Sequence, residues 1–198
     1  MINKSLSIII VLFVSSLSAA GGFDLAKSAG KGNWEFSLTW NPLNIFPQGQ
    51  SYIIGSYGIN NDVDLHFYYS QNNDFGDNYY GGFFYQFIRN DKINISTAIG
   101  VRGYLNNSVK HFFLPQLFFS TQLSEKILIG GSAVDIRNIS NFERISDKPA
   151  VDSYITYNFI NTNKIELGIS IGAFHPSLWT PSNGNWHPTY SLQIKILN

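Results

Sequence analysis

Apolar and polar residues alternate with a period of two in many segments of this 198-residue chain. In the segment 33–41 every even-numbered residue is aromatic or aliphatic, and every odd-numbered residue is polar. The same alternation recurs in segments 63–70, 93–102, 151–159, 165–173 and 189–196. A period of two is typical of a β-strand whose two faces meet different surroundings, so the chain is predicted to be all-β.

Four further segments are predicted as strands with a less regular alternation: 51–59, 79–88, 111–123 and 127–136. Pro115 cannot donate a ladder hydrogen bond, so we predict a β-bulge there. A second bulge is predicted at Gly130-Gly131, where it would exchange the two faces of its strand. The total is ten strands, with eight as the alternative.

The connections between these strands fall into two length classes. Short polar turns are expected at 60–62, 89–91, 124–126 and 161–163, and longer loops at 42–50, 71–78, 106–110, 138–150 and 175–188. Short and long connections alternate along the chain. Short turns at one end and long loops at the other are typical of a closed, antiparallel, up-and-down transmembrane β-barrel.

The composition indicates which face of the strands is outside. Charged residues make up only 13% of the chain, against roughly 25% in a soluble domain. The polar faces carry mostly Ser, Thr, Gly, Asn and Gln, whereas a water-exposed surface is rich in Lys and Glu. We therefore predict that the apolar face contacts lipid. Tyrosine and tryptophan side chains near the strand ends suit interfacial girdles (Trp34, Trp40, Tyr69, Tyr79, Tyr157 and Tyr190).

The amino terminus has the pattern of an export signal. Lys4 precedes the apolar stretch 6–17, and Ser18-Ala19-Ala20 provides small residues for cleavage. We divide the chain into a signal peptide (1–20), a mobile lead-in (21–32) and the barrel (33–198). The absence of cysteine excludes disulfides, and equal numbers of basic and acidic residues, 13 each, argue against nucleic-acid binding.

Over residues 33–197 this pattern resembles the small bacterial outer-membrane β-barrel superfamily, without a motif of any single family. The resemblance implies a location in a Gram-negative outer membrane, contact with its lipid and lipopolysaccharide, and insertion by the barrel-assembly machinery. Such proteins often end on an aromatic residue, whereas this chain ends on Asn198.

Inward-facing charges are few, and they form two predicted clusters and one predicted pair. Near the short-turn end, Lys195 is expected between Glu35 and Glu166, as an ion-pair ladder at the closing seam or as a polar plug. On the third strand, Asp64 and His66 are expected to form a hydrogen-bonded pair.

Near the outer end, the second cluster is a salt-bridge network or a charge-selecting constriction built from Arg102, Asp135, Arg137 and Asp152. Inward aromatic side chains argue against a wide aqueous channel (Tyr104, Phe112, Phe118, Tyr154 and Phe174).

The last long loop carries His175, Trp179, Trp186 and His187, with prolines after both histidines. We expect these residues to stiffen the loop against the outer leaflet or the barrel mouth. Because the loop contains no carboxylate, it is not predicted to be a metal site. No cofactor is predicted for the chain.

Three functions are compatible with this pattern. The first is a non-enzymatic outer-membrane barrel with a structural or surface-interaction role, or with a narrow conduit for small solutes. The second is a lipid-modifying enzyme, similar to lipid A deacylases or acyltransferases, that uses a rim histidine such as His111 or His175. The third is a soluble, lipocalin-like barrel that binds an apolar ligand inside.

Overall fold

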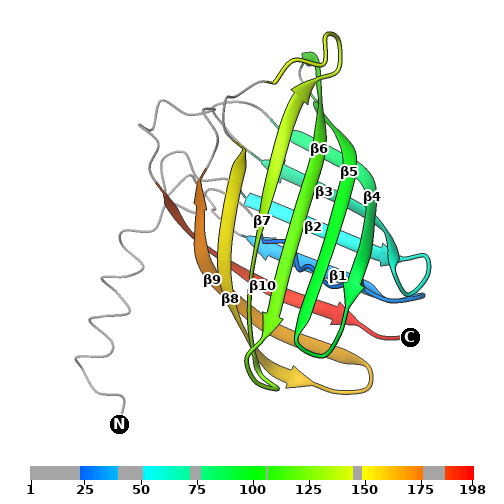
Figure 1. The fold of residues 1–198 in the computed structure, drawn as a ribbon, viewed down its shortest axis with the longest axis vertical. Coiled ribbons are helices and arrows are strands. Elements are labelled where there is room, and N and C mark those ends of the chain that lie inside the picture. Colours follow the sequence, from blue (N-terminus) through cyan, green and yellow to red (C-terminus); the bar gives the residue numbers. More distant parts are fainter. Residues whose placement is uncertain (1–22, 40–50, 72–76, 106, 145–148, 176–185) are drawn as a thin grey trace.

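The computed structural model describes residues 23–39, 51–71, 77–105, 107–144, 149–175 and 186–198. Ten antiparallel strands close into a single barrel, with each strand beside its neighbours in sequence and β1 beside β10 (Figure 1). The prediction of ten strands is confirmed, and the alternative of eight is wrong. The strands are β1 (Trp34–Thr39), β2 (Ser51–Gly58), β3 (Val63–Gln71), β4 (Asn78–Arg89), β5 (Ile93–Tyr104), β6 (Asn107–Gln122), β7 (Ile127–Asn138), β8 (Ala150–Asn161), β9 (Ile165–His175) and β10 (His187–Ile196).

Each of the four short turns is held by a polar side chain that bonds the turn backbone, namely Asn60, Asn90, Ser124 or Thr162. The Oδ1 atom of Asn60 accepts hydrogen bonds from the backbone N–H groups of Asp62 and Val63, each at 2.8 Å. Asn90 makes the equivalent bonds in the β4–β5 turn, and Thr162 bonds the backbone in the same way in the β8–β9 turn. Such local side-chain bonds favour turns over continued strand, and they explain why these connections are tight.

Both ends of the barrel lie at the short-turn side. β1 pairs with β10 from Trp34 opposite Ile196 to Leu38 opposite Leu192. The backbone N–H of Asn198 donates to Oδ1 of Asn33 at 2.9 Å, which joins the end of the barrel to its beginning.

The two predicted bulges have different outcomes. The register shifts between Phe113 and Gln116, so the bulge at Pro115 is confirmed. The ladder runs unbroken through Gly130 and Gly131, so the second bulge is wrong. Proline lacks the ladder donor, whereas glycine keeps it, and that difference explains the outcome.

The predicted loop at 106–110 is also wrong, because β6 begins at Asn107 and β5 extends to Tyr104. The alternation of short and long connections is therefore broken at this place.

The two faces of the barrel wall have opposite polarity. Large apolar side chains project outward, among them Ile171, Phe83 and Ile155, which are 57%, 55% and 53% exposed. Small polar side chains such as Ser96 and Ser170 face inward and are fully buried. The predicted orientation is confirmed. Within the described residues no helix is long and apolar enough to cross a membrane, a criterion that does not concern strands.

Two inward tyrosines lie flat against the wall. A Cβ atom added to Gly100 would overlap the ring of Tyr80 on β4, and one added to Gly130 would overlap the ring of Tyr154 on β8. Each ring therefore occupies the space that a side chain on the adjacent strand would fill. The centre of the lumen is left for another part of the chain.

Candidate functional site

Residues 23–32, which we call the plug, occupy the lumen. The side chains of Phe23, Ala26, Ser28 and Ala29 are buried by the surrounding strands, although none of these residues belongs to a strand. The sequence pattern predicted a lead-in here and assigned it no place in the lumen. Residues 1–22, with the predicted signal peptide, lie outside the described residues.

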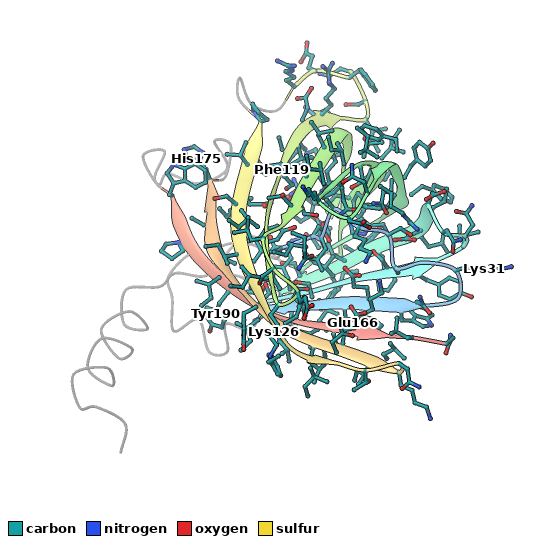
Figure 2. All side chains as sticks on the ribbon, turned by 60° about the horizontal axis from the view of Figure 1, so that its bottom comes forward. Lys31, Phe119, Lys126, Glu166, His175 and Tyr190 are labelled. Atoms are coloured by element: carbon teal, nitrogen blue, oxygen red, sulfur yellow. The ribbon has the colours of Figure 1, made fainter. Side chains whose placement is uncertain are left out.

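Glycines turn the plug into the barrel at the short-turn end. Gly30 and Gly32 have φ values of 85° and 78°, a conformation that favours glycine. The backbone N–H of Gly32 donates to the carbonyl oxygen of Gly58 at 2.8 Å, and that of Gly58 donates to the carbonyl oxygen of Asn33 at 3.0 Å. A Cβ atom on Gly58 would overlap the carbonyl group of Gly30. Lys31 sits at this turn and projects away from the barrel (Figure 2).

Polar side chains of β3 and β4 hold the middle of the plug. The carboxylate of Asp64 accepts hydrogen bonds from Oγ of Ser28 at 2.6 Å and from the backbone N–H of Ala29 at 2.9 Å. Oε1 of Gln86 accepts from the backbone N–H of Ser28 at 3.0 Å. These groups satisfy plug backbone that strand pairing cannot reach.

The beginning of the plug crosses to the opposite side of the lumen. The hydroxyl of Ser96 on β5 donates to the carbonyl oxygen of Ala26 at 3.0 Å. The hydroxyl of Tyr154 on β8 donates to the carbonyl oxygen of Asp24 at 2.8 Å, and its ring packs on that of Phe23 with centroids 5.1 Å apart. The plug therefore contacts both halves of the barrel wall.

Asp64 and His66 both face the lumen, but their partners differ from the predicted pair. Nε2 of His66 lies 3.3 Å from the carboxylate of Asp24, and its Nδ1 lies 3.0 Å from Oγ of Ser56. Asp64 instead bonds Ser28 and Ala29. Both side chains therefore hold the plug, a role that the sequence analysis did not assign.

The cluster near the short-turn end has the predicted arrangement. Lys195 lies opposite Glu35 on one side and opposite Glu166 on the other. Its Nζ atom is 3.9 Å from the carboxylate of Glu35. These three side chains and Lys27 of the plug line a cavity of about 80 Å³.

Of the predicted outer cluster, Arg102 and Asp152 line the same cavity, although each has a bonding partner of its own. Nη2 of Arg102 is 2.9 Å from Nδ1 of His111. Asp152 accepts from the hydroxyl and the backbone N–H of Ser132.

Asp135 forms an ion pair with Arg137 at 3.0 Å, and a second with Arg144 at 3.2 Å. Without a bulge at Gly130-Gly131, Val134 and Ile136 keep the inward positions of β7. Asp135 and Arg137 consequently belong to the other face, and the predicted convergence with Arg102 and Asp152 is wrong.

A second cavity, of about 100 Å³, lies on the other side of the plug. Asp24 of the plug lines it together with His66, Tyr80, Arg102, Gln116 and Asp152. The plug thus borders one cavity through Lys27 and the other through Asp24.

The inward aromatic residues narrow the lumen as expected at three described positions. Phe118 and Tyr154 are buried, and Phe174 borders the second cavity. Tyr104 is partly exposed. The side chain of Phe112 lies outside the described part of the structure.

The histidines of the outer rim have different surroundings. His111 is buried and faces Arg102 in the lumen. The ring of His175 packs on that of Trp186, with centroids 5.5 Å apart. Trp179 and the side chain of His187 are outside the described residues, and the structure does not test their predicted roles.

The sequence contains two signals for the plug that alternation does not reveal. Five of its ten residues are small, namely Ala26, Ser28, Ala29, Gly30 and Gly32, and the two glycines stand just before β1. The inward faces of β3 to β5 carry Asp64, Gln86 and Ser96. Their side chains have hydrogen-bonding groups that the backbone ladder does not use. No protein-family model matches the chain, and no curated protein sequence matches it significantly. The structure therefore assigns the chain to closed ten-stranded antiparallel barrels by its fold alone.

Proposed function

We propose that the protein is an outer-membrane β-barrel protein of a Gram-negative bacterium, with a non-enzymatic structural or surface-interaction role. Its outer face contacts membrane lipid and lipopolysaccharide, and the barrel-assembly machinery inserts it. The observation that carries the proposal is the outward apolar face on a closed barrel.

Exposed large apolar side chains are present on nearly every strand, from Trp34 on β1 to Ile196 on β10. Soluble monomers rarely expose a continuous apolar patch above roughly 300–600 Å². A lipid environment removes the cost of such a surface, and barrel closure pairs the strand edges that lipid cannot solvate. A soluble lipocalin-like barrel would require the opposite orientation of the two faces.

The plug supports a closed barrel rather than an open pore in this conformation. It crosses the lumen, and its polar groups are bonded to Asp64, Gln86 and Ser96. The lipid-modifying alternative gains no support from His111, since this side chain is directed into the lumen and away from the lipid.

Cell fractionation followed by gel electrophoresis tests the proposal. We expect the protein in the outer-membrane fraction, with a migration that changes on heating because closed barrels resist detergent until heated. Comparison of lipid A mass spectra with and without the protein adds a check on the non-enzymatic role, and we expect no difference. Recovery of the protein in the soluble periplasm, or altered lipid A, would overturn it.

A further inference from the structure

The way in which the plug is held against the barrel wall indicates that it can leave the lumen. The plug is a single segment whose centre is held by hydrogen bonds to polar side chains, while Phe23 and Ala26 pack against apolar side chains of the wall. Water can replace each of these bonds, so removal of the plug leaves a lumen that water can wet.

The cavities on the two sides of the plug mark a path through the barrel. One is lined by groups near the short-turn end, including Glu35, Glu166 and Lys195. The other extends toward the long-loop end, past Arg102 and Phe174. Without the plug these spaces would join along the volume that it now fills. The path would be about as wide as the segment that now fills it.

The wall of this path is acidic. The inward charged side chains that the structure describes on the strands comprise four carboxylates and three basic groups: Glu35, Asp64, Asp152 and Glu166 against Arg89, Arg102 and Lys195. The plug carries Lys27 and Lys31 against Asp24. Carboxylates that line a narrow pore attract cations and repel anions, so this wall favours the passage of cations.

The contact at Gly58 provides a place where the plug can be detached. The plug returns to the wall through Gly30 and Gly32, and it fits there because Gly58 has no side chain. A larger residue at position 58 would overlap the backbone of Gly30 without altering any charged group of the lumen.

We propose that residues 23–32 are a displaceable plug and that the lumen behind it conducts small cations. This inference rests on the proposed membrane location, and it names the solute class and the gate of that same barrel. Displacement breaks the bonds to Asp64, Gln86 and Ser96, which then become solvated by water and ions in the open path.

Planar-bilayer recordings in potassium chloride test this inference. Three full-length proteins are compared, namely the unaltered chain, Gly58→Val and the control Gly81→Ala, together with a variant that lacks residues 23–31. Gly81 is a suitable control because nothing lies within 4 Å of a Cβ atom added there. Heat-dependent gel migration first establishes that each variant has folded.

We expect brief or rare openings for the unaltered chain and for Gly81→Ala. Gly58→Val is expected to increase open time by about tenfold or more, since even a small loss of docking energy changes a two-state population by that order. The deletion variant is expected to stay open. In a salt gradient, the reversal potential of both open forms should indicate selectivity for potassium over chloride.

A thiol probe gives a second readout. The chain contains no cysteine, so Ser28→Cys introduces a single thiol in the middle of the plug. A cationic thiol reagent should label it faster than an anionic one of similar size, and labelling should accelerate when Gly58→Val is added.

A folded deletion variant that is silent would overturn the inference, and so would selectivity for anions. Equal conductance of the unaltered chain and the deletion variant would overturn the role of the plug. In each case a membrane-inserted, heat-modifiable barrel would leave the proposed membrane location standing. A soluble protein would instead remove that location.

Discussion

The two sides of the lumen use their polar side chains in different ways. On β3 to β5, Asp64, Gln86 and Ser96 bond the plug, a segment more than 30 residues away in sequence. On the other side, around the seam, inward hydroxyl groups bond one another directly from strand to strand. Examples are Thr39 with Ser191 and Thr156 with Ser170, each at 2.7 Å.

This difference teaches that these hydroxyl pairs are complete without the plug, whereas the acceptors on β3 and β4 are not. Removing the plug would take both plug donors from the carboxylate of Asp64 on β3, and one of two donors from Oε1 of Gln86 on β4. Substitutions on the plug side should therefore depend on the plug, and those on the seam side should not. Each prediction below compares the full chain with a chain that lacks residues 23–31.

The largest effect is expected for Asp64→Ala, on the plug side. The substitution removes a buried carboxylate that accepts two hydrogen bonds from the plug. We expect a loss of about 3 kcal/mol in the free energy of unfolding, since bonds to charged groups contribute roughly 1.5–3 kcal/mol. Urea unfolding in lipid vesicles measures it, and Asp64→Asn should lose less. A similar loss in the chain without the plug would contradict the comparison.

Gly58→Val should lower the free energy of unfolding by about 2 kcal/mol, which is within the range for forced overpacking. The added side chain would overlap the backbone carbonyl group of Gly30. The same unfolding measurement is made in both chains. In the chain without residues 23–31 the loss should nearly vanish, and its persistence there would assign the strain to the barrel wall.

Ser170→Ala tests the seam side. The hydroxyl of Ser170 is bonded to Thr156 and receives a hydrogen bond from Nε2 of Gln193 at 3.0 Å. We expect a loss of about 1 kcal/mol, typical of an uncharged hydrogen bond, and the same loss with or without the plug. Unequal losses in the two chains would show that the seam side also depends on the plug.

The smallest effect is expected for Asp135→Asn, which belongs to neither side of the lumen. Asp135 pairs with Arg137 and with the exposed Arg144 near the long-loop end. Partly exposed ion pairs contribute roughly 0.5 kcal/mol, and salt reduces the contribution. Unfolding at low and high salt should reveal a small loss at low salt only. A large, salt-independent loss would place this carboxylate within the packed lumen.

Most of the barrel could be predicted from the sequence because alternation reports directly which face of a strand is buried. The strand order, the closure of β1 on β10 and the position of Lys195 between Glu35 and Glu166 all follow from counting along paired strands. The bulge at Pro115 could be predicted because a missing N–H group is a local property.

The plug could not be predicted in this way because it is not a strand and has no periodicity. Its position depends on bonds to Asp64, Gln86 and Ser96, which lie on three different strands. The division of the outer charged cluster was missed for a related reason. Whether Gly130-Gly131 forms a bulge depends on the partner strands, and a regular ladder there reverses the inferred direction of Asp135.

The buried position of Phe23 has a practical consequence for anyone who labels this molecule. A purification tag or fluorescent protein fused directly ahead of Phe23 would be attached inside the barrel, where it would compete with the plug for the space of the lumen. Asn198 is exposed at the other terminus, so a carboxy-terminal fusion leaves the interior unaltered.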